Sequence, residues 1–168
     1  MKFPRSIRLD QSDPNIFSPA AEPGEWAVPG TFAFAGRDPA TLTGKDKLAF
    51  HTGWLGTGSF GRCTLVEVAE IDEDAYSAVV DSLARHFVDT YGAPTLAAAL
   101  SAAREEVEDA AGLCGHPTGS LLALEREVTG DSIAERFRII RPDRAADHAR
   151  IWEIVPDEGD ESNKPEPD

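Results

Sequence analysis

The middle of the chain constrains the fold most, because two helical patterns follow each other there with almost no linker. Between positions 72 and 91, apolar side chains recur at helical spacing, and Asp72 stands where an N-cap is expected. A second helical pattern runs from Thr95 to Cys114. Only a Gly-Ala-Pro linker at 92–94 separates them. We therefore expect the two helices to pack as a hairpin or to meet at a sharp bend.

Strand patterns lie on both sides of this helical pair. Alternating or β-branched residues predict strands over the following ranges: 6–9, 31–35, 62–71, 121–128, 133–140 and 151–155. The ranges 121–128 and 133–140 flank a Thr-Gly-Asp turn and predict a β-hairpin, and a short helix is expected over 41–50. The order of strands, helices and strands predicts an α+β fold, with a mainly antiparallel sheet and a two-helix layer packed on one face.

The C-terminus differs in composition from the rest of the chain. Residues 157–168 carry six acidic side chains against one lysine and have no apolar anchor. Such a segment cannot bury enough apolar surface to fold, so we expect a disordered acidic tail there. Residues 1–156 are long enough to form one domain with its own core.

The charge balance argues against several classes of partner. The chain has 30 acidic and 16 basic residues, a net charge of −14. A surface this acidic repels a phosphate backbone, so no nucleic acid partner is expected. No apolar run approaches the ~20 residues of a membrane helix, and the N-terminus lacks the apolar region of a secretory signal. We therefore expect no membrane association and a cytoplasmic protein.

A glycine-rich motif, GTGSFG, occupies positions 56–61 and matches the pattern G-x-G-x-x-G. In dinucleotide-binding domains this motif follows a strand and opens a helix, whereas here the apolar run 64–68 comes after the glycines. The longer stretch LGTGSFGR at 55–62 resembles the phosphate loop of protein kinases, which implies ATP binding and a lysine on the next strand. No lysine occurs between Lys47 and Lys164, and no H-R-D or D-F-G motif is present. The chain is therefore predicted not to be a protein kinase.

The same loop has a structural interpretation, because glycines permit tight turns and positive φ angles. If a ligand comes close to the backbone, we expect it to do so here, with one arginine as the nearby positive charge. The candidate residues of this loop are Gly53, Gly56, Gly58, Gly61 and Arg62.

Cysteine and histidine residues offer a weak candidate for a metal site. Cys63, Cys114 and His116 are the possible ligands, but no C-x-x-C or H-x-x-x-H spacing is present. Burial of both thiols as small apolar side chains is the alternative. Cys114 with His116 or His86 would supply a nucleophile and a base, yet no third, orienting group is recognisable. The sequence thus predicts no cofactor, leaves catalytic residues unknown and favours a non-enzymatic protein.

Three tryptophans are candidates for an interaction surface. Trp26, Trp54 and Trp152 lie in predicted loop or edge regions, and aromatic side chains are enriched at interfaces. The alternative is that they close the open ends of the core.

Three stretches together resemble a family of small uncharacterised bacterial proteins of proteobacterial type. They are KFPRSIRLD at 2–10, AEPGEWAVPG at 21–30 and SFGRCTLVEV at 59–68, and the likeness extends to about Pro142. The resemblance implies a bacterial, cytosolic protein of unknown function. It brings no activity, cofactor or catalytic residue with it.

Two hypotheses of different classes follow. The first is a non-enzymatic accessory or partner-binding protein, acting through a protein partner or through self-association. The second is a small-molecule or metal-binding domain, with or without enzymatic activity, that uses the glycine loop and the Cys63, Cys114 and His116 group. The second hypothesis requires a concave pocket that brings these residues together.

Overall fold

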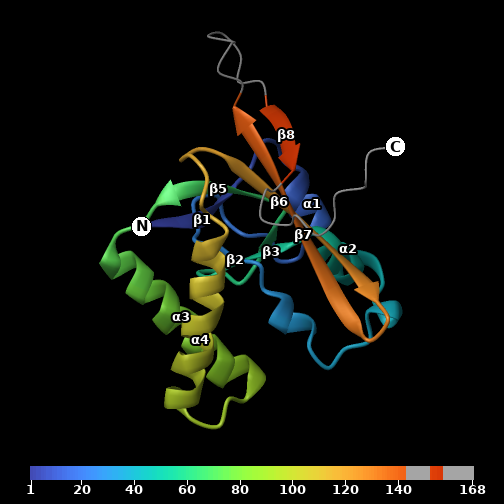
Figure 1. Cartoon of the computed structure of the whole chain (residues 1–168). Helices are drawn as coiled ribbons and strands as arrows, with labels where there is room; N and C mark the ends of the chain where they lie inside the picture. Colours follow the sequence, from blue (N-terminus) through green and yellow to red (C-terminus); the bar gives the residue numbers. More distant parts are fainter. Residues whose placement is uncertain (143–151, 157–168) are drawn as a thin grey trace.

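The computed structural model describes residues 1–142 and 152–156, which form two antiparallel sheets and four α-helices (Figure 1). The larger sheet has the strand order β1-β5-β6-β7-β8, and the smaller has the order β2-β3-β4. The predicted α+β fold with a mainly antiparallel sheet is confirmed.

The elements have the following bounds. The larger sheet contains β1 (Lys2–Ile7), β5 (Leu65–Glu70), β6 (Leu121–Thr129), β7 (Ser132–Pro142) and β8 (Trp152–Pro156). The smaller sheet contains β2 (Ala27–Val28), β3 (Trp54–Gly56) and β4 (Arg62–Cys63). The α-helices are α1 (Ser12–Ile16), α2 (Gly44–Thr52), α3 (Glu73–Tyr91) and α4 (Leu96–Gly112), and two 3-10 helices are η1 (Thr31–Phe34) and η2 (Pro39–Thr41).

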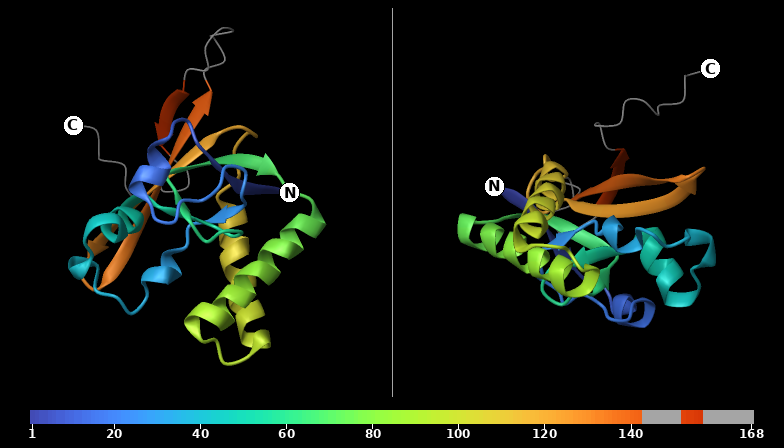
Figure 2. Two further views of the ribbon diagram at one scale, coloured as in Figure 1. Left: turned by 180° about the vertical axis from the view of Figure 1, so that it is seen from behind. Right: turned by 90° about the horizontal axis from the view of Figure 1, so that it is seen from below.

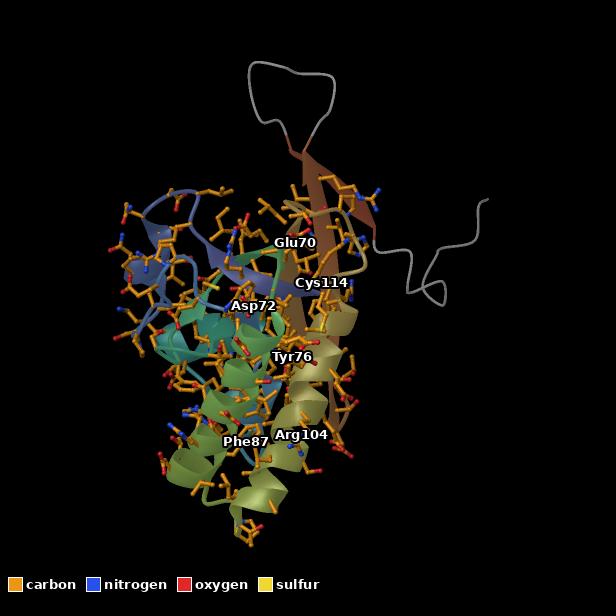
Figure 3. The ribbon with its side chains drawn as sticks, turned by 90° about the vertical axis from the view of Figure 1, so that its left-hand side faces the viewer. Glu70, Asp72, Tyr76, Phe87, Arg104 and Cys114 are labelled. Carbon is orange, nitrogen blue, oxygen red and sulfur yellow. The ribbon has the colours of Figure 1, made fainter. Side chains whose placement is uncertain are left out.

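The helical hairpin α3–α4 forms where the sequence predicts it. The Asp72 carboxylate accepts a hydrogen bond from the backbone N of Ala75 at 2.7 Å and so caps α3. Gly92 ends α3 with a left-handed φ of 65°, and the Thr95 hydroxyl accepts from the backbone N of Ala98 to cap α4. Figure 3 shows the two helices side by side, with Cys114 just beyond the end of α4.

The hairpin covers the end of the larger sheet at which β1 lies. Leu83 of α3 and Ala103 of α4 are fully buried in one cluster with Phe3 of β1 and Val28 of β2. Small alanines on the buried stripe of α4 let the helix approach its neighbours closely. Burying a side chain such as Leu83 contributes ~1.5–3 kcal/mol.

The two sheets share a second buried cluster. Trp54 of β3 and Cys63 of β4 pack there with Val66, Leu122 and Ile139 of the larger sheet. A third cluster lies beneath α2 and joins Phe34, Leu42 and Phe50.

The segment 62–71, predicted as one strand, forms two strands in different sheets. The break falls at Thr64, between β4 and β5. At this break Thr64 is hydrogen-bonded to buried Asp13. The Asp13 carboxylate accepts from the Thr64 hydroxyl at 2.7 Å and from the Thr64 backbone N at 3.4 Å. The Asp13 carboxylate thus competes with the sheet for the backbone N–H of Thr64.

The prediction of a strand over 31–35 is wrong, because these residues form η1. Gly30 precedes η1 with a left-handed φ of 72°, and the two phenylalanines of the segment pack in different places. Phe32 lies against α3, whereas Phe34 joins the cluster beneath α2. The alternating phenylalanines of this segment therefore pack into two separate clusters and do not belong to a strand.

The acidic tail predicted at 157–168 lies outside the described residues, and a single domain over 1–156 remains a prediction. Within the part of the chain that the structure describes, no helix has the length and apolar content needed to cross a membrane.

Candidate functional site

The glycine loop is built around an acidic side chain of the chain itself. One carboxylate oxygen of Glu25 accepts hydrogen bonds from the backbone N of Gly58 at 3.0 Å and of Ser59 at 2.6 Å. The second oxygen accepts from the Ser59 hydroxyl at 2.7 Å. Consecutive backbone N–H groups that converge in this way form an anion-binding nest. In this protein the anion is Glu25.

The glycines of the loop permit these close approaches. A Cβ atom on Gly56 would lie 2.7 Å from a Glu25 carboxylate oxygen, and one on Gly61 would lie 2.4 Å from the carbonyl carbon of Ala20. Gly58 is exposed and belongs to the nest. The groups that come close to the backbone at these positions are therefore other parts of the same chain.

The two remaining features of the predicted loop, Gly53 and Arg62, belong to a buried structural centre. The Gly53 carbonyl accepts hydrogen bonds from Arg62 Nη1 at 3.1 Å and from Arg126 Nη1 at 3.0 Å. Both guanidinium groups lie over the ring of Phe34, at 4.9 Å and 5.5 Å from its centroid. Burial lowers the pKa of Arg62 to about 9 and that of Arg126 to about 10. Arg62 is thus engaged inside the protein.

Phe60 connects the glycine loop to α3. It has a positive φ of 56°, a strained conformation for an aromatic residue. Its ring stacks on His86 of α3 with the centroids 3.7 Å apart and the planes at 6°. A hydrogen bond of 2.6 Å from the Ser82 hydroxyl to the Thr57 carbonyl holds the same two segments together. The strained backbone of Phe60 therefore places its ring against His86 and joins the glycine loop to α3.

This contact begins a continuous aromatic cluster, which we define as Phe60, His86, Tyr91, Phe32 and Phe87. His86 and Tyr91 meet edge to face at 5.4 Å, and Tyr91 meets Phe32 in the same way at 5.6 Å. Phe32 then packs on Phe87 at 4.8 Å. The cluster joins the glycine loop, the last turns of α3 and η1.

A groove of about 450 Å³ lies against one side of the aromatic cluster. Its floor is formed by Phe32, Phe87 and Tyr91 together with Ala98 and Ala102 of α4. We call it the aromatic groove. Tyr91 is 47% exposed beside it, so a large aromatic surface remains open to solvent.

Two carboxylates, Glu105 and Glu106 of α4, line the same groove. Partial burial raises the pKa of Glu106, and the neighbouring charges of Asp109, Glu135 and Glu105 raise it further. The aromatic groove therefore combines an apolar floor with a negatively charged rim.

A second, polar depression of about 470 Å³ lies on α3 and includes Phe60, Asp81, Arg85 and His86. Burial lowers the pKa of His86, with the charge of Asp89 opposing this effect. His86 Nδ1 lies 3.2 Å from the hydroxyl of Thr90, one helical turn away.

The cysteine and histidine candidates do not assemble into a metal centre. Cys63 and Cys114 are both free and buried in the cluster between the sheets. Burial raises the pKa of both thiols, that of Cys114 to about 12, so neither forms a thiolate readily. His116 is partly exposed, and its backbone carbonyl accepts from Lys2 Nζ. Across residues 1–142 and 152–156, no three His, Cys, Asp or Glu side chains are grouped so that they could hold a metal ion.

The tryptophans occupy three different environments. Trp54 has no exposed surface and packs near Phe137, so it closes the core as the alternative interpretation predicts. Trp26 is partly buried against Phe3, with the Arg5 guanidinium over its ring at 5.8 Å. Trp152 is the first residue of β8. A role for Trp26 or Trp152 at an interface remains a prediction.

Sequence analysis missed the residues that form the most open aromatic surface. The helical pattern over 72–91 includes Phe87 and Tyr91, but helical spacing does not indicate which of these side chains stay open to solvent. The contribution of Phe32 was hidden because its segment was predicted as a strand. A positive φ at Phe60 and the contact between Glu25 and Ser59 have no signal in the sequence, because they depend on how distant segments pack.

Comparison with known proteins gives a family without an assigned function. A family model described as a family of unknown function, DUF6505, matches residues 1–153. No curated protein and no solved structure matches the chain.

Proposed function

Since the chain belongs to DUF6505, a family of unknown function, we propose from its physical features that it is a non-enzymatic accessory protein of the bacterial cytoplasm. In this proposal it binds a partner protein through the aromatic groove. The observation that carries the proposal is the aromatic surface at the end of the helical hairpin, where exposed Tyr91 meets the partly buried ring of Phe32.

The surface has the composition of an interaction site. Tyrosine and other aromatic side chains are enriched among the residues that dominate binding energy. Tyr91 and Leu96 flank the turn between α3 and α4 and are 47% and 57% exposed. Large apolar side chains that are gathered in this way on an acidic protein favour a contact with another macromolecule.

The position of the surface also favours access by a large partner. The turn between α3 and α4 lies at the end of the molecule opposite β8 (Figures 1 and 2). Among the elements of residues 1–142 and 152–156, none closes over this turn in the views, so a partner protein can approach it without rearrangement of the sheets.

One further observation supports the cellular setting of the proposal. Both cysteines are free thiols, which suits a reducing compartment such as the cytoplasm. The alternative hypothesis of a metal-binding or small-molecule domain gains no support, because the glycine loop holds Glu25 and the thiols lie in the core.

Site-specific photo-crosslinking tests the proposal. A benzoylphenylalanine at position 91 is compared with one at position 48 of α2, because Tyr91 and Leu48 are both 47% exposed. We expect position 91, and not position 48, to crosslink to a defined protein in a bacterial lysate. The crosslinked protein is then purified, and its binding to the unmodified chain is measured.

The groove itself is tested with a pair of variants on α4. Ala98→Arg places a long side chain in the aromatic groove, whereas Ala97→Arg places the same side chain on an exposed position that does not line it. We expect Ala98→Arg to weaken binding of the purified partner at least about tenfold and Ala97→Arg to leave it unchanged. Equal binding by both variants, or identical crosslinks from positions 91 and 48, would refute the proposed function.

A further inference from the structure

We propose that the aromatic groove recognises a partner segment that presents a lysine or arginine next to a large apolar side chain, with Glu106 binding the positive charge. This inference rests on the proposed function and specifies the chemistry of the partner. Three features support this inference: the shape of the groove, its negative charge, and the repulsion of acidic segments by that charge.

The apolar floor sets the first requirement. Phe32 and Phe87 meet edge to face, with their centroids 4.8 Å apart and their planes at 86°, and Tyr91 extends this wall toward solvent. A groove of about 450 Å³ lies within the range of ~300–1,000 Å³ that encloses small ligands. It therefore accommodates one large apolar side chain and the side chain next to it.

The acidic rim sets the second requirement. Positions 98, 102, 105 and 106 share one face of α4 because they follow helical spacing, and all four line the groove. By the same spacing, Arg104, which is labelled in Figure 3, lies on the opposite face of α4. The positive charge of Arg104 is therefore directed away from the groove.

The carboxylates of the rim differ from several glutamates elsewhere in the structure that pair with arginines. Glu67, Glu125 and Glu135 each lie within salt-bridge distance of an arginine, at 2.7 Å, 3.1 Å and 3.7 Å. Among the ion pairs between residues 1–142, none uses Glu105 or Glu106. A cation supplied by a partner would complete this site in the way that arginines of the chain complete the others.

The charged side chains that act on Glu106 are negative, and they favour a positive charge beside it. Glu105 and Asp109 come from α4, and Glu135 comes from β7, so the charges that act on Glu106 from both elements are negative. A lysine or arginine in the groove would also lie beside the rings of Tyr91 and Phe32, whose faces attract cations. Apolar and electrostatic recognition thus meet at one place.

The same charges exclude two other occupants. A second copy of this chain has a net charge of −14 and would bring another set of carboxylates to the groove. The C-terminal residues 157–168 carry six acidic residues and one basic residue, so they are repelled from the same rim. Charge complementarity therefore selects a different, basic partner.

A phage-displayed library of random dodecapeptides tests the inference. The wild-type chain is used for selection, and the Ala98→Arg variant is used to remove phage that bind elsewhere. We expect the enriched peptides to carry lysine or arginine within one or two positions of Leu, Phe or Trp. Enrichment of neutral or acidic sequences, or no enrichment over the Ala98→Arg variant, would overturn the inference.

Glu106 is tested with the most enriched peptide. Glu106→Gln is compared with Glu108→Gln, which removes the same charge from an exposed position of α4 outside the groove. We expect Glu106→Gln to weaken binding about five- to tenfold and Glu108→Gln to change it less than about twofold. Equal affinities for the two variants would contradict the role given to Glu106.

The result is separable from a folding defect and from failure of the proposed function. Glu106→Gln removes a charge whose partial burial disfavours ionisation, so we expect its melting temperature to equal or exceed that of the wild type. If position 91 crosslinks to a partner and Ala98→Arg abolishes binding, but the selected peptides lack basic residues, the proposed function stands and this inference fails. If neither assay depends on the groove, both fail.

Discussion

At the scale of single residues, Glu25 gives the glycine loop the negative group that a bound anion would otherwise supply. Its carboxylate accepts from the backbone N–H groups of Glu22, Gly58 and Ser59 and from the Ser59 hydroxyl. Charge-assisted hydrogen bonds of this kind are about twice as strong as neutral ones. The glycines that resemble a kinase phosphate loop in sequence therefore surround an internal carboxylate in this protein.

The contribution of Glu25 can be measured directly. We expect Glu25→Gln to lower the free energy of unfolding by about 1–2 kcal/mol, because the amide keeps the size of the side chain but loses the charge that the nest binds. Urea unfolding at pH 7 provides the measurement. Glu22→Gln, at an exposed neighbouring position, is the control and should change stability by less than about 0.5 kcal/mol. Similar losses in the two variants would show that the nest is not what stabilises the loop.

His86 makes the stability of the protein depend on pH. Burial lowers its pKa below the ordinary value of 6.5 in the folded state, so the unfolded chain binds the proton more readily. The contribution of His86 is therefore complete above pH 6.5 and is lost as the pH falls from 6.5 through the folded-state pKa.

Comparison with His86→Gln isolates this effect. We expect the difference in free energy of unfolding between the wild type and His86→Gln to be constant above about pH 7.5. It should shrink as the pH falls below 6.5, and ring-proton NMR titration of His86 should give a pKa under that value. Parallel stability curves from pH 8 to pH 5 would contradict the prediction.

At the scale of elements, Arg126 joins segments that the sequence places far apart. From β6, its guanidinium donates to the Phe50 and Gly53 carbonyls at the end of α2, each at 3.0 Å. It also donates to the Pro29 carbonyl, just after β2, and to the Thr31 hydroxyl at the start of η1. The positive charge meets the negative end of the α2 dipole, which adds to these hydrogen bonds.

Removal of the Arg126 guanidinium should loosen the attachment of α2 to the rest of the fold. We expect Arg126→Met to destabilise the protein by about 3 kcal/mol or more, because several buried carbonyl groups lose their donor at once. Arg136→Met, which removes an exposed arginine from β7, should cost less than about 1 kcal/mol. Hydrogen exchange would show early loss of protection in 44–52 in the first variant. Unchanged exchange there would mean that α2 is held by its apolar contacts alone.

How much of this fold could be predicted depended on the range of the interactions involved. The ends of α3 were predictable because Asp72 and Gly92 act within one turn of the helix. The β6–β7 hairpin was equally local, since Gly130 turns the chain with a φ of 61° between paired strands. The separation of β4 from β5 was not predictable, because it depends on Asp13, which is 51 positions away from Thr64.

The candidate site was less predictable than the fold for the same reason. The aromatic groove combines η1, α3 and α4, and its wall requires Phe32 to lie against Phe87 across 55 positions of sequence. The glycine motif marks a loop in which backbone N–H groups converge, but only the structure shows that Glu25 is the group they bind. Residues with a conspicuous sequence pattern were structural here, whereas the groove is formed by alanines and phenylalanines without a motif.

At the scale of the whole molecule, the two sheets and the helical hairpin have different roles. The shared clusters around Trp54 and Arg126 bind the sheets, η1 and α2 into one support. The hairpin extends from this support and carries the aromatic groove at its free end (Figure 2). Ala98 and Glu106 line the groove but belong to none of the buried clusters, so variants at these two positions should alter binding without unfolding the protein.

The limits of the folding unit provide the last prediction. β8 pairs with β7 from Arg138↔Pro156 to Pro142↔Trp152 and forms one edge of the larger sheet. A chain that ends at Pro156 keeps this pairing and loses only residues 157–168, whose composition offers no apolar side chain to bury. A chain that ends at Pro142 loses the edge strand and leaves one side of β7 without hydrogen-bond partners. We expect the first chain to match the full-length protein in free energy of unfolding within about 0.5 kcal/mol and the second to be less stable by about 1 kcal/mol or more. Equal stability of the two shortened chains would place β8 outside the folding unit, and a loss in the first would assign residues 157–168 a part in it.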